Sequence, residues 1–446
     1  MSAAEHQRRL EVIEICAGAG GQSLGLHRAG FTHRLAVELD GQAAHTLEQN
    51  LRRVLKDDGV DVDHDLVRVG DVADPNVWNP DAYKKGEIDL LAGGVPCPPF
   101  SIAGKQLGSS DERDLFAWAI ELCGRMRPKA LLLENVRGLS TNRFAGYRQA
   151  VLDKLHEFGY IAFWKLLNAS DYGVPQLRPR FVLVALLPEY AKYFSWPETR
   201  PGEAPTVGEV LVDLMGENGW GDEEVAHWVE KANDIAPTIV GGSKKHGGAD
   251  LGPTRAKQAW SKLGVDAMGI ANEAPAAGFR PLKGATGPKL TTKMVARLQG
   301  WHDEFAEWEF LGRKTSVYRQ IGNAFPPPVA KALGESIKDA LLQKGEPQPL
   351  VETSSTVHDP VYKLLREQSR PLTTEQIITK LAKNGLAMDQ PEVERRLNHL
   401  GHDFEVEKTE RKSGELAYSL GNFKAFVGQE DHQRHDLFIQ HRTRIS

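Results

Sequence analysis

Short apolar segments alternate with amphipathic segments along the first 190 residues of this chain. The apolar segments are rich in Val, Ile and Leu, which favour strands, and the segments between them have the apolar spacing of helices. This alternation is typical of a doubly wound α/β sheet, in which ligands bind beyond the carboxyl ends of the strands. We expect strands at 11–16, 34–39, 66–70, 88–93, 130–135, 161–168 and 180–187, and helices at 22–29, 113–127 and 143–158.

Composition narrows the class of protein. A chain of 446 residues predicts two or three domains, and 41% hydrophobic residues suit a globular core. The three cysteines, Cys16, Cys97 and Cys123, form no CxxC pair, so we expect neither a disulfide framework nor a metal site. Neither a signal peptide nor 18 consecutive apolar residues occurs, which favours a cytoplasmic protein. The net charge of -5 excludes a uniformly basic surface but allows a local basic face.

The first expected strand leads into the glycines Gly18, Gly20 and Gly21, which allow a tight turn and close approach to a ligand. Ser23 stands where a dinucleotide fingerprint has its last glycine, so the pattern disfavours NAD but still fits a nucleoside cofactor. Acids end the next two strands. Glu38 follows Gly18 by 20 positions and suits ribose hydroxyls, while Asp71 could contact an adenine edge. A structural turn beside two solvated acids is the alternative.

The fourth strand ends in "GGVPCPPFSIAGKQ", residues 93–106, in which Cys97 follows Pro96 and precedes Pro98 and Pro99. Each proline fixes its own φ, and Pro98 restricts Cys97 to extended backbone, so no helix passes through the thiol. This frame predicts a cysteine presented at a strand end. A buried, inert cysteine is the competing interpretation.

The fifth strand, "ALLLENVRGL", ends in Glu134. Burial there would raise the pKa of the carboxyl group and let Glu134 deliver a proton, although a helix cap or a pair with Arg137 is also open. Further on, Arg178 and Arg180 are predicted to alternate on one face of an extended segment. They would form a two-pronged clamp for an anion or a carbonyl, unless they serve as surface salt-bridge partners.

Taken together, these segments resemble the C5-cytosine DNA methyltransferase family from about residue 11 to residue 343. The matching blocks, in family order, are EICAGAGGQSLGL, VELD, GDV, GGVPCPPFS, LLLENVRGL, LNASDYGVPQLRPR, PKLTTKMVARLQGW and YRQIGNAFPPPVA. The resemblance implies a Rossmann-like, S-adenosylmethionine-dependent methyltransferase sheet with a smaller target-recognition domain. It also implies methyl transfer from S-adenosyl-L-methionine to C5 of a cytosine flipped out of a specific duplex DNA sequence.

The resemblance assigns roles to residues. Cys97 would attack C6, Glu134 would hold and protonate N3, and Arg180 would contact O2 of the base, with Arg178 and Gln176 in support. The implied cofactor contacts are Cys16, Ala17, Gly18, Gly20, Gly21, Glu38, Leu39, Asp71, Val72, Pro96 and Asn323. The chain departs from the family pattern twice, with Cys16 in place of the usual Phe and Pro98 in place of the usual Gln.

The expected domains follow the same resemblance. They are a catalytic domain at 1–187 completed by 318–343, a target-recognition domain at 188–317, a linker at 344–360, a winged-helix-like extension at 361–425 and a tail at 426–446. In the target-recognition domain, Lys244, Lys245, Arg255 and Lys257 lie among glycines and are predicted to bind DNA, unless they form a solvated loop. The extension could touch DNA or a partner, or only pack.

By this resemblance we expect a monomeric bacterial enzyme that lies at the nucleoid and does not associate with a membrane. The expected partners are double-stranded DNA and a cognate restriction endonuclease. A tRNA cytosine-C5 methyltransferase is one alternative, but the Cys-Phe-Thr signature of that branch is absent, since no cysteine follows Cys123. A non-catalytic DNA-binding regulator is another, and the intact Cys97, Glu134 and Arg180 argue against it. The DNA sequence that is recognised cannot be read from these residues.

Overall fold

A seven-stranded sheet forms the centre of the protein, in the order β3-β2-β1-β4-β5-β7-β6. The computed structural model describes residues 9–62, 64–96, 115–241, 249–281, 283–349 and 359–424. The strands are β1 (Leu10–Ile15), β2 (Phe31–Glu38), β3 (Val67–Val69), β4 (Leu90–Gly93), β5 (Ala130–Val136), β6 (Ile161–Asn168) and β7 (Pro179–Leu186). All seven expected strands are present. From β3 to β5 the strands run parallel, whereas β7 is antiparallel to both of its neighbours.

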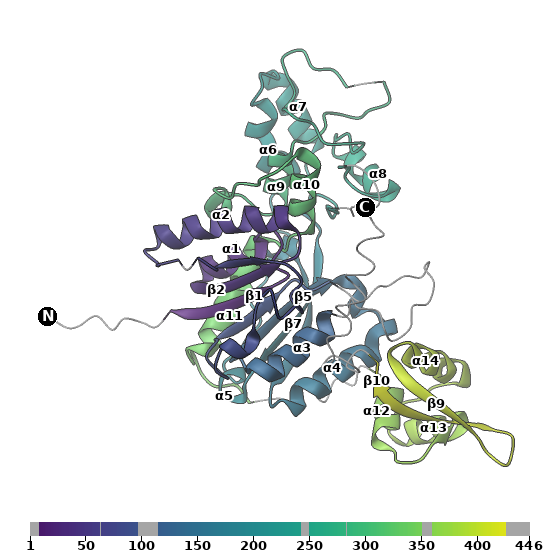
Figure 1. Ribbon diagram of the computed structural model, residues 1–446. Coiled ribbons are helices and arrows are strands. Elements are labelled where there is room, and N and C mark those ends of the chain that lie inside the picture. The colour runs from purple at the N-terminus through teal and green to yellow at the C-terminus, as the bar shows by residue number, and fades with distance from the viewer. Residues whose placement is uncertain are drawn as a thin grey trace.

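Helices cover both faces of the sheet (Figure 1), because the strands are apolar on both sides. On β5, Leu131 and Leu133 face one apolar core while Leu132 faces the other. The covering helices are α3 (Leu115–Met126) and α4 (Ala145–Glu157) on the first face, and α1 (Gly21–Ala29) and α11 (Pro327–Leu341) on the second. A Cβ atom at Gly25 of α1 would lie 2.5 Å from the Cβ atom of Ala330, so glycine permits the close packing of α1 on α11.

The helix α2 (Gly41–Asp57) follows β2 and was not among the expected helices. Asp40 caps the N-terminus of this helix, because its carboxylate accepts hydrogen bonds from the amides of Gln42 and Ala43. Its residues Leu47 and Leu51 belong to the apolar core of the second lobe, so α2 joins the sheet to that lobe.

The second lobe consists of the helices from α6 to α10 and lies over the carboxyl ends of the parallel strands (Figure 1). Its helices are α6 (Val207–Gly216), α7 (Asp222–Lys231), α8 (Thr254–Lys262), α9 (Thr292–Leu298) and α10 (Lys314–Asn323). They pack around Trp228 and Trp260, and the indole of Trp228 donates a hydrogen bond to the Gly264 carbonyl at 3.0 Å. The expected domain boundary after residue 317 therefore falls inside α10, whose Val317 and Ile321 belong to this core.

The C-terminal module, residues 359–424, contains three helices and a three-stranded antiparallel sheet in the order β8-β10-β9. Its elements are α12 (Pro360–Glu367), β8 (Leu372–Thr373), α13 (Thr374–Lys383), α14 (Gln390–Asp403), β9 (Phe404–Glu410) and β10 (Leu416–Phe423). The three expected helices and the hairpin are all present. The expected tail at 426–446 lies outside the described residues.

The C-terminal module is docked against α4 (Figure 1). The hydroxyl of Tyr362 donates to the Asp153 carboxylate at 2.8 Å, and Arg143 forms an ion pair with Asp403 at 3.0 Å. The apolar residues of the module belong to the same core cluster as α3 and α4. The module is therefore packed on the sheet-bearing domain through a shared apolar core.

The remaining helices are short. They are α5 (Pro188–Ala191) and the 3₁₀ helices η1 (Pro80–Ala82), η2 (Arg137–Ser140), η3 (Asn142–Phe144), η4 (Ala169–Tyr172) and η5 (Asp303–Phe305). Within the described residues, no helix combines the length and apolar character needed to span a membrane.

Candidate active site

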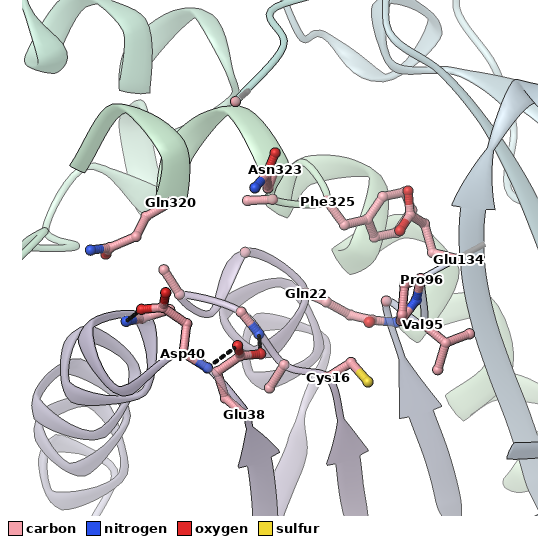
Figure 2. Close-up of a pocket in the computed structure, with 18 of the residues that line it drawn as sticks. Cys16, Gln22, Glu38, Asp40, Val95, Pro96, Glu134, Gln320, Asn323 and Phe325 are labelled. Carbon is pink, nitrogen blue, oxygen red and sulfur yellow. Dashed lines mark hydrogen bonds between the residues drawn. The ribbon is translucent and has the colours of Figure 1, made fainter. Parts of the chain in front are cut away.

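A cavity of about 750 Å³ lies between the carboxyl ends of the parallel strands and the second lobe. Residues at or just beyond the carboxyl ends of β1, β2, β3, β4 and β5 line one side, and α10 with the segment 238–241 lines the other. Figure 2 shows Glu38 and Glu134 on opposite sides of this cavity, with Gln22 between them. The polar residues predicted at successive strand ends are thus brought to one site.

The glycine turn after β1 packs tightly against the segments that precede and follow α10. Gly18 and Gly20 have φ angles of +59° and +95°, which side-chain-bearing residues rarely adopt. A Cβ atom at Gly20 would lie 2.3 Å from the ring of Trp308, whose indole donates to the Ala19 carbonyl at 2.8 Å. At Gly21, a Cβ atom would lie 2.3 Å from the Phe325 carbonyl oxygen. The turn therefore requires glycine at these positions.

Glu38, at the end of β2, is held by backbone amides. Its Oε2 accepts from the Gly18 amide at 2.7 Å and its Oε1 accepts from the Asp40 amide at 2.8 Å. Burial raises the pKa of the Glu38 carboxyl group, and these hydrogen bonds act in the opposite direction. Each carboxylate oxygen has a second lone pair, so the group can also accept from a pair of ligand hydroxyls.

The wall beyond Glu38 combines apolar surface with one acid. Leu39 is 54% exposed and lines the cavity together with Val72 and Asp71. Asp71 Oδ1 accepts from the Ala73 amide at 2.9 Å. Cys16 also lines the cavity, and burial raises the pKa of its thiol, which stays neutral at ordinary pH. This end of the cavity can enclose a flat, largely apolar ring.

At the opposite end, Glu134 and Arg180 form an ion pair with 2.5 Å between Oε1 and Nε. They come from the antiparallel strands β5 and β7, in which Val136 pairs with Arg180. Both residues are buried. Burial lowers the pKa of Arg180, and the neighbouring carboxylate offsets part of this effect. The structure thus gives Glu134 the partner Arg180, and not the alternative partner Arg137.

Arg178 lines the same cavity as Arg180, but its NH groups bind backbone carbonyls, which favours the supporting role over the two-pronged clamp. It is 1% exposed and precedes β7. Its guanidinium donates to the carbonyls of Ile239, Gly322 and Ala324 at 2.6, 2.7 and 2.9 Å. Burial lowers the pKa of Arg178 well below the usual value for arginine. Its hydrogen bonds fasten the segment 238–241 to the end of α10.

Gln176 is fully buried, which fits the supporting role that the resemblance implies, while a contact of Gln176 with DNA stays a prediction. Its Nε2 donates to Gln299 Oε1 at 2.7 Å and to the Leu298 carbonyl at 3.1 Å, and its Oε1 accepts from the Ile239 amide at 2.8 Å. These bonds use the carboxamide on protein groups. Gln176 therefore supports the wall of the site from behind.

The remaining predicted residues fall into three groups. Ala17, Pro96 and Asn323 line the cavity, whereas Arg255 and Lys257 lie on α8, where Lys257 pairs with Asp250 at 2.8 Å. Cys97, Lys244 and Lys245 lie outside the described residues. Pro96, the residue before Cys97, brings the chain to the edge of the cavity.

The sequence pattern did not reveal every lining residue. Gln22 is the second residue of α1 and directly follows the glycine turn, and the others come from segments without a strand-end pattern. The additional lining residues include Gln22, Trp118, Thr238, Val240 and Arg319.

The fold and the site define a class of protein: a Rossmann-like α/β protein in which a cavity at the strand ends contains a buried acid–arginine pair. A family model described as C-5 cytosine-specific DNA methylase matches residues 10–339. The chain belongs to this family and is a DNA (cytosine-5)-methyltransferase. The resemblance inferred from the sequence blocks is thereby confirmed.

Two relatives and one solved structure show how far the similarity extends. Type II methyltransferase M.NaeI from Lentzea aerocolonigenes is 60% identical over 98% of this chain and 99% of its own length. Type II methyltransferase M.NgoMIV from Neisseria gonorrhoeae is 47% identical over 74% of this chain and 97% of its own length. A crystal structure described as a prophage-encoded DNA modification methyltransferase from E. coli is 22% identical, with a TM-score of 0.48, over 75% of this chain and 100% of that chain.

Proposed function

We propose that S-adenosylmethionine is the methyl donor of this enzyme. The residues of the cavity fit that molecule, since Glu38 can accept from both ribose hydroxyls and Leu39 with Val72 offers apolar surface to an adenine ring. Asp71 would accept from the exocyclic amine of that ring. When bound, the donor supplies an electrophilic methyl group on a sulfonium sulfur. The close packing of Gly20 and Gly21 leaves the turn no room for side chains on its buried side.

We propose Cys97 as the nucleophile. C5 of cytosine is a poor nucleophile until a thiolate adds to C6, because the new C6–S bond opens the C5–C6 double bond and turns the ring into an enamine. The target atom is inaccessible in a stacked duplex, so the base must leave the helix, at a cost of about a few kcal/mol. The position of Pro96 at the cavity supports this role for the residue that follows it.

Glu134 and Arg180 would hold the flipped base. Glu134 would take up a proton from solvent as the base enters and pass it to N3 while the C6–S bond forms, and the guanidinium of Arg180 would donate to O2 of the ring. Their ion pair fixes both groups before the base arrives, and burial strengthens their electrostatic effect. After C5 is methylated, the C5 proton would pass to a base such as a solvent water, the electrons of the C5–H bond would re-form the C5–C6 double bond, and Cys97 would leave as the thiolate.

The Glu134–Arg180 pair in the same cavity as Glu38 is the observation that carries this proposal. The test is bisulfite sequencing of DNA from cells that express the wild-type chain or Cys97→Ser. We expect site-specific 5-methylcytosine with the wild type and none with Cys97→Ser. Equal methylation by both proteins would exclude Cys97 as the nucleophile.

We further propose that methylation of duplex DNA protects it from a cognate restriction endonuclease, with the enzyme acting as a monomer at the bacterial nucleoid. The names of the two relatives, both type II methyltransferases, support this role. In this proposal residues 188–317 recognise the target, with Lys244, Lys245, Arg255 and Lys257 near the phosphates. The site found by bisulfite mapping identifies an endonuclease whose cleavage should fail on plasmid from expressing cells. Cleavage of fully methylated plasmid would contradict the protective role.

A further inference from the structure

Arg148 is a buried arginine in α4 that holds the segment following Glu134. Only 5% of Arg148 is exposed. Its Nη1 donates to the carbonyls of Leu139 and Thr141 at 2.7 and 2.8 Å. Leu139 belongs to η2, which follows β5 directly, and Thr141 comes just after η2. One guanidinium therefore fixes the chain a few residues beyond Glu134.

The same guanidinium contacts β7 beside Arg180. Its central carbon lies 5.8 Å from the ring centroid of Phe181, and a cation within about 6 Å of an aromatic face is attracted to it. Phe181 pairs with Asn135, the residue after Glu134. Successive side chains of a strand point to opposite faces of the sheet, so the Phe181 ring lies on the face opposite to Glu134 and Arg180. Arg148 thus supports both strands from behind the acid–arginine pair.

The C-terminal module packs on this same end of α4. Arg143, in η3, forms its ion pair with Asp403 at the end of α14. The ring centroid of Tyr147, next to Arg148 in α4, lies 5.1 Å from that of Phe423 in β10. The module therefore contacts residues on the N-terminal side of Arg148, between this arginine and β5.

The module also supplies a negative charge near Arg148. Burial lowers the pKa of Arg148 to about 10, and the charge of Asp359 acts in the opposite direction. Asp359 is 2% exposed, caps α12 through the amides of Val361 and Tyr362, and lies 3.5 Å from Arg396. Its carboxylate favours the charged form of the buried guanidinium, which the cation–π contact with β7 requires.

We propose that Arg148 is a positioning residue for methyl transfer, and that the C-terminal module holds Arg148 and the segment after β5 in place. The inference rests on the proposed function, in which Glu134 and Arg180 hold the flipped base. Arg148 does not line the cavity in the part of the chain that the structure describes. It binds the segments beside both residues of the pair, and a shift of less than 1 Å in a catalytic group can slow a reaction about tenfold or more.

Two substitutions of Arg148 test this role in the full chain. Arg148→Met removes the guanidinium but keeps a long side chain, and Arg148→Lys keeps the charge and one donor group. We expect Arg148→Met to lower the single-turnover rate constant for methyl transfer to duplex DNA about tenfold or more, and Arg148→Lys to lower it less. The dissociation constants for S-adenosylhomocysteine and for the same DNA should change by less than about twofold, because Arg148 is outside the cavity.

Two variants of the interface separate positioning from stability. Arg143→Gln removes the ion pair with Asp403 close to Arg148, whereas Tyr362→Phe removes the hydrogen bond to Asp153, further along α4. Both should lower the midpoint of thermal unfolding, but only Arg143→Gln should slow methyl transfer, by about threefold, with unchanged DNA affinity. Equal rates for these two variants would overturn the role of the module. This comparison and Arg148→Lys also serve if Arg148→Met does not fold.

A double variant shows whether Arg148 acts through Glu134. In the Glu134→Gln background, Arg148→Met should slow transfer by less than about threefold, because the acid that it positions is already absent. The full loss in both backgrounds would overturn the inference. An unchanged rate in folded Arg148→Met, or a loss of ligand binding as large as the loss of rate, would do the same. Failure of the proposed function is a separate result, because Glu134→Gln alone would then turn over like the wild type.

Discussion

Glu134 and Arg180 face each other across β5 and β7, with Oε1 and Nε 2.5 Å apart and both side chains buried. The antiparallel strand β7 makes this possible, since it returns past β5 and delivers Arg180 at the level of Val136. A sheet with only parallel strands would not place an arginine from the next strand beside Glu134 in this register. The reversed strand is therefore part of the candidate active site.

Substitution of Glu134 by Gln should stop catalysis but not cofactor binding. The amide keeps the shape of the side chain and removes the proton delivery to N3, so we expect the methylation rate constant to fall about 100-fold or more. Single-turnover transfer of a labelled methyl group to duplex DNA measures it. The dissociation constant for S-adenosylhomocysteine is the control, because Glu38 and Glu134 lie on opposite sides of the cavity (Figure 2). Near wild-type turnover by this variant would remove Glu134 from the mechanism.

Substitution of Arg178 by Lys should destabilise the protein. An ammonium group cannot reach the three carbonyls that the guanidinium holds, and the loss should cost about 2 kcal/mol or more. Thermal unfolding should show a lower midpoint. The matched control is Arg255→Lys on the exposed start of α8, which should change stability by less than about 0.5 kcal/mol. If both variants have the same midpoint of thermal unfolding as the wild type, the three hydrogen bonds contribute nothing measurable to stability.

Cofactor binding should depend on pH through Glu38. Burial raises the pKa of this carboxyl above its ordinary 4.5, and ribose hydroxyls donate to the ionised form. As pH falls through the raised pKa, Glu38 takes up a proton and affinity for S-adenosylhomocysteine should decrease. Because of the raised pKa, the folded protein without cofactor binds this proton more tightly than the unfolded chain does. The free energy of unfolding therefore decreases as pH rises from 4.5 through the raised pKa of Glu38.

Calorimetry from pH 5 to pH 8 measures the effect on affinity, and Glu38→Gln is the matched variant. It should bind more weakly by about tenfold at pH 8 and lose most of the pH dependence. A Glu38→Gln profile parallel to that of the wild type would assign the dependence to another group.

Removal of residues 350–446 should weaken the fold more than DNA binding. It exposes the surface of α4 that the C-terminal module covers, including Tyr147, whose ring centroid lies 5.1 Å from that of Phe423. The module has 11 Lys and Arg and 11 Asp and Glu in residues 359–424, so its net formal charge is 11 − 11 = 0. Since phosphate contacts need positive charge, the DNA dissociation constant at fixed salt should change by less than about threefold, while the midpoint of unfolding falls.

Tyr362→Phe is the mild version of this change, because it removes only the hydrogen bond to Asp153 and should cost about 1 kcal/mol. A loss of DNA affinity together with a shallower salt dependence in the truncated protein would instead make the module a DNA-binding element. The relative M.NgoMIV is shorter than this chain, since 97% of its length matches only 74% of this chain. The two proteins together would therefore show how much DNA binding depends on the part of this chain that M.NgoMIV does not match.

The sequence predicted the strands and the acids at their ends because both follow from local pattern. Gly18, Glu38, Asp71 and Glu134 come directly after apolar segments, and parallel strands bring such positions to one edge. The role of Arg178 could not be predicted in this way. Its partners Ile239 and Gly322 lie 61 and 144 residues further along the chain, and their carbonyls carry no side-chain signal.

For the same reason, the sequence could not predict where the side chains of Gln176 and Gln22 lie. Gln176 stands in a recognised block, but burial by segments 122 and 123 residues away decides that its carboxamide stays inside the protein. At Gln22, the pattern of glycines fixes the turn and says nothing about the next side chain. Only the folded arrangement shows that it reaches the cavity.

The packing of α11 on α1 has a consequence for how the chain matures. The part of the sheet face that α11 covers stays uncovered during synthesis until residue 341 has left the ribosome, long after β1, β4 and β5 have emerged. Loop closure over so many residues is slow. A nascent chain stalled in the second lobe would expose that face to other chains, so translation speed and chaperone access should govern its yield.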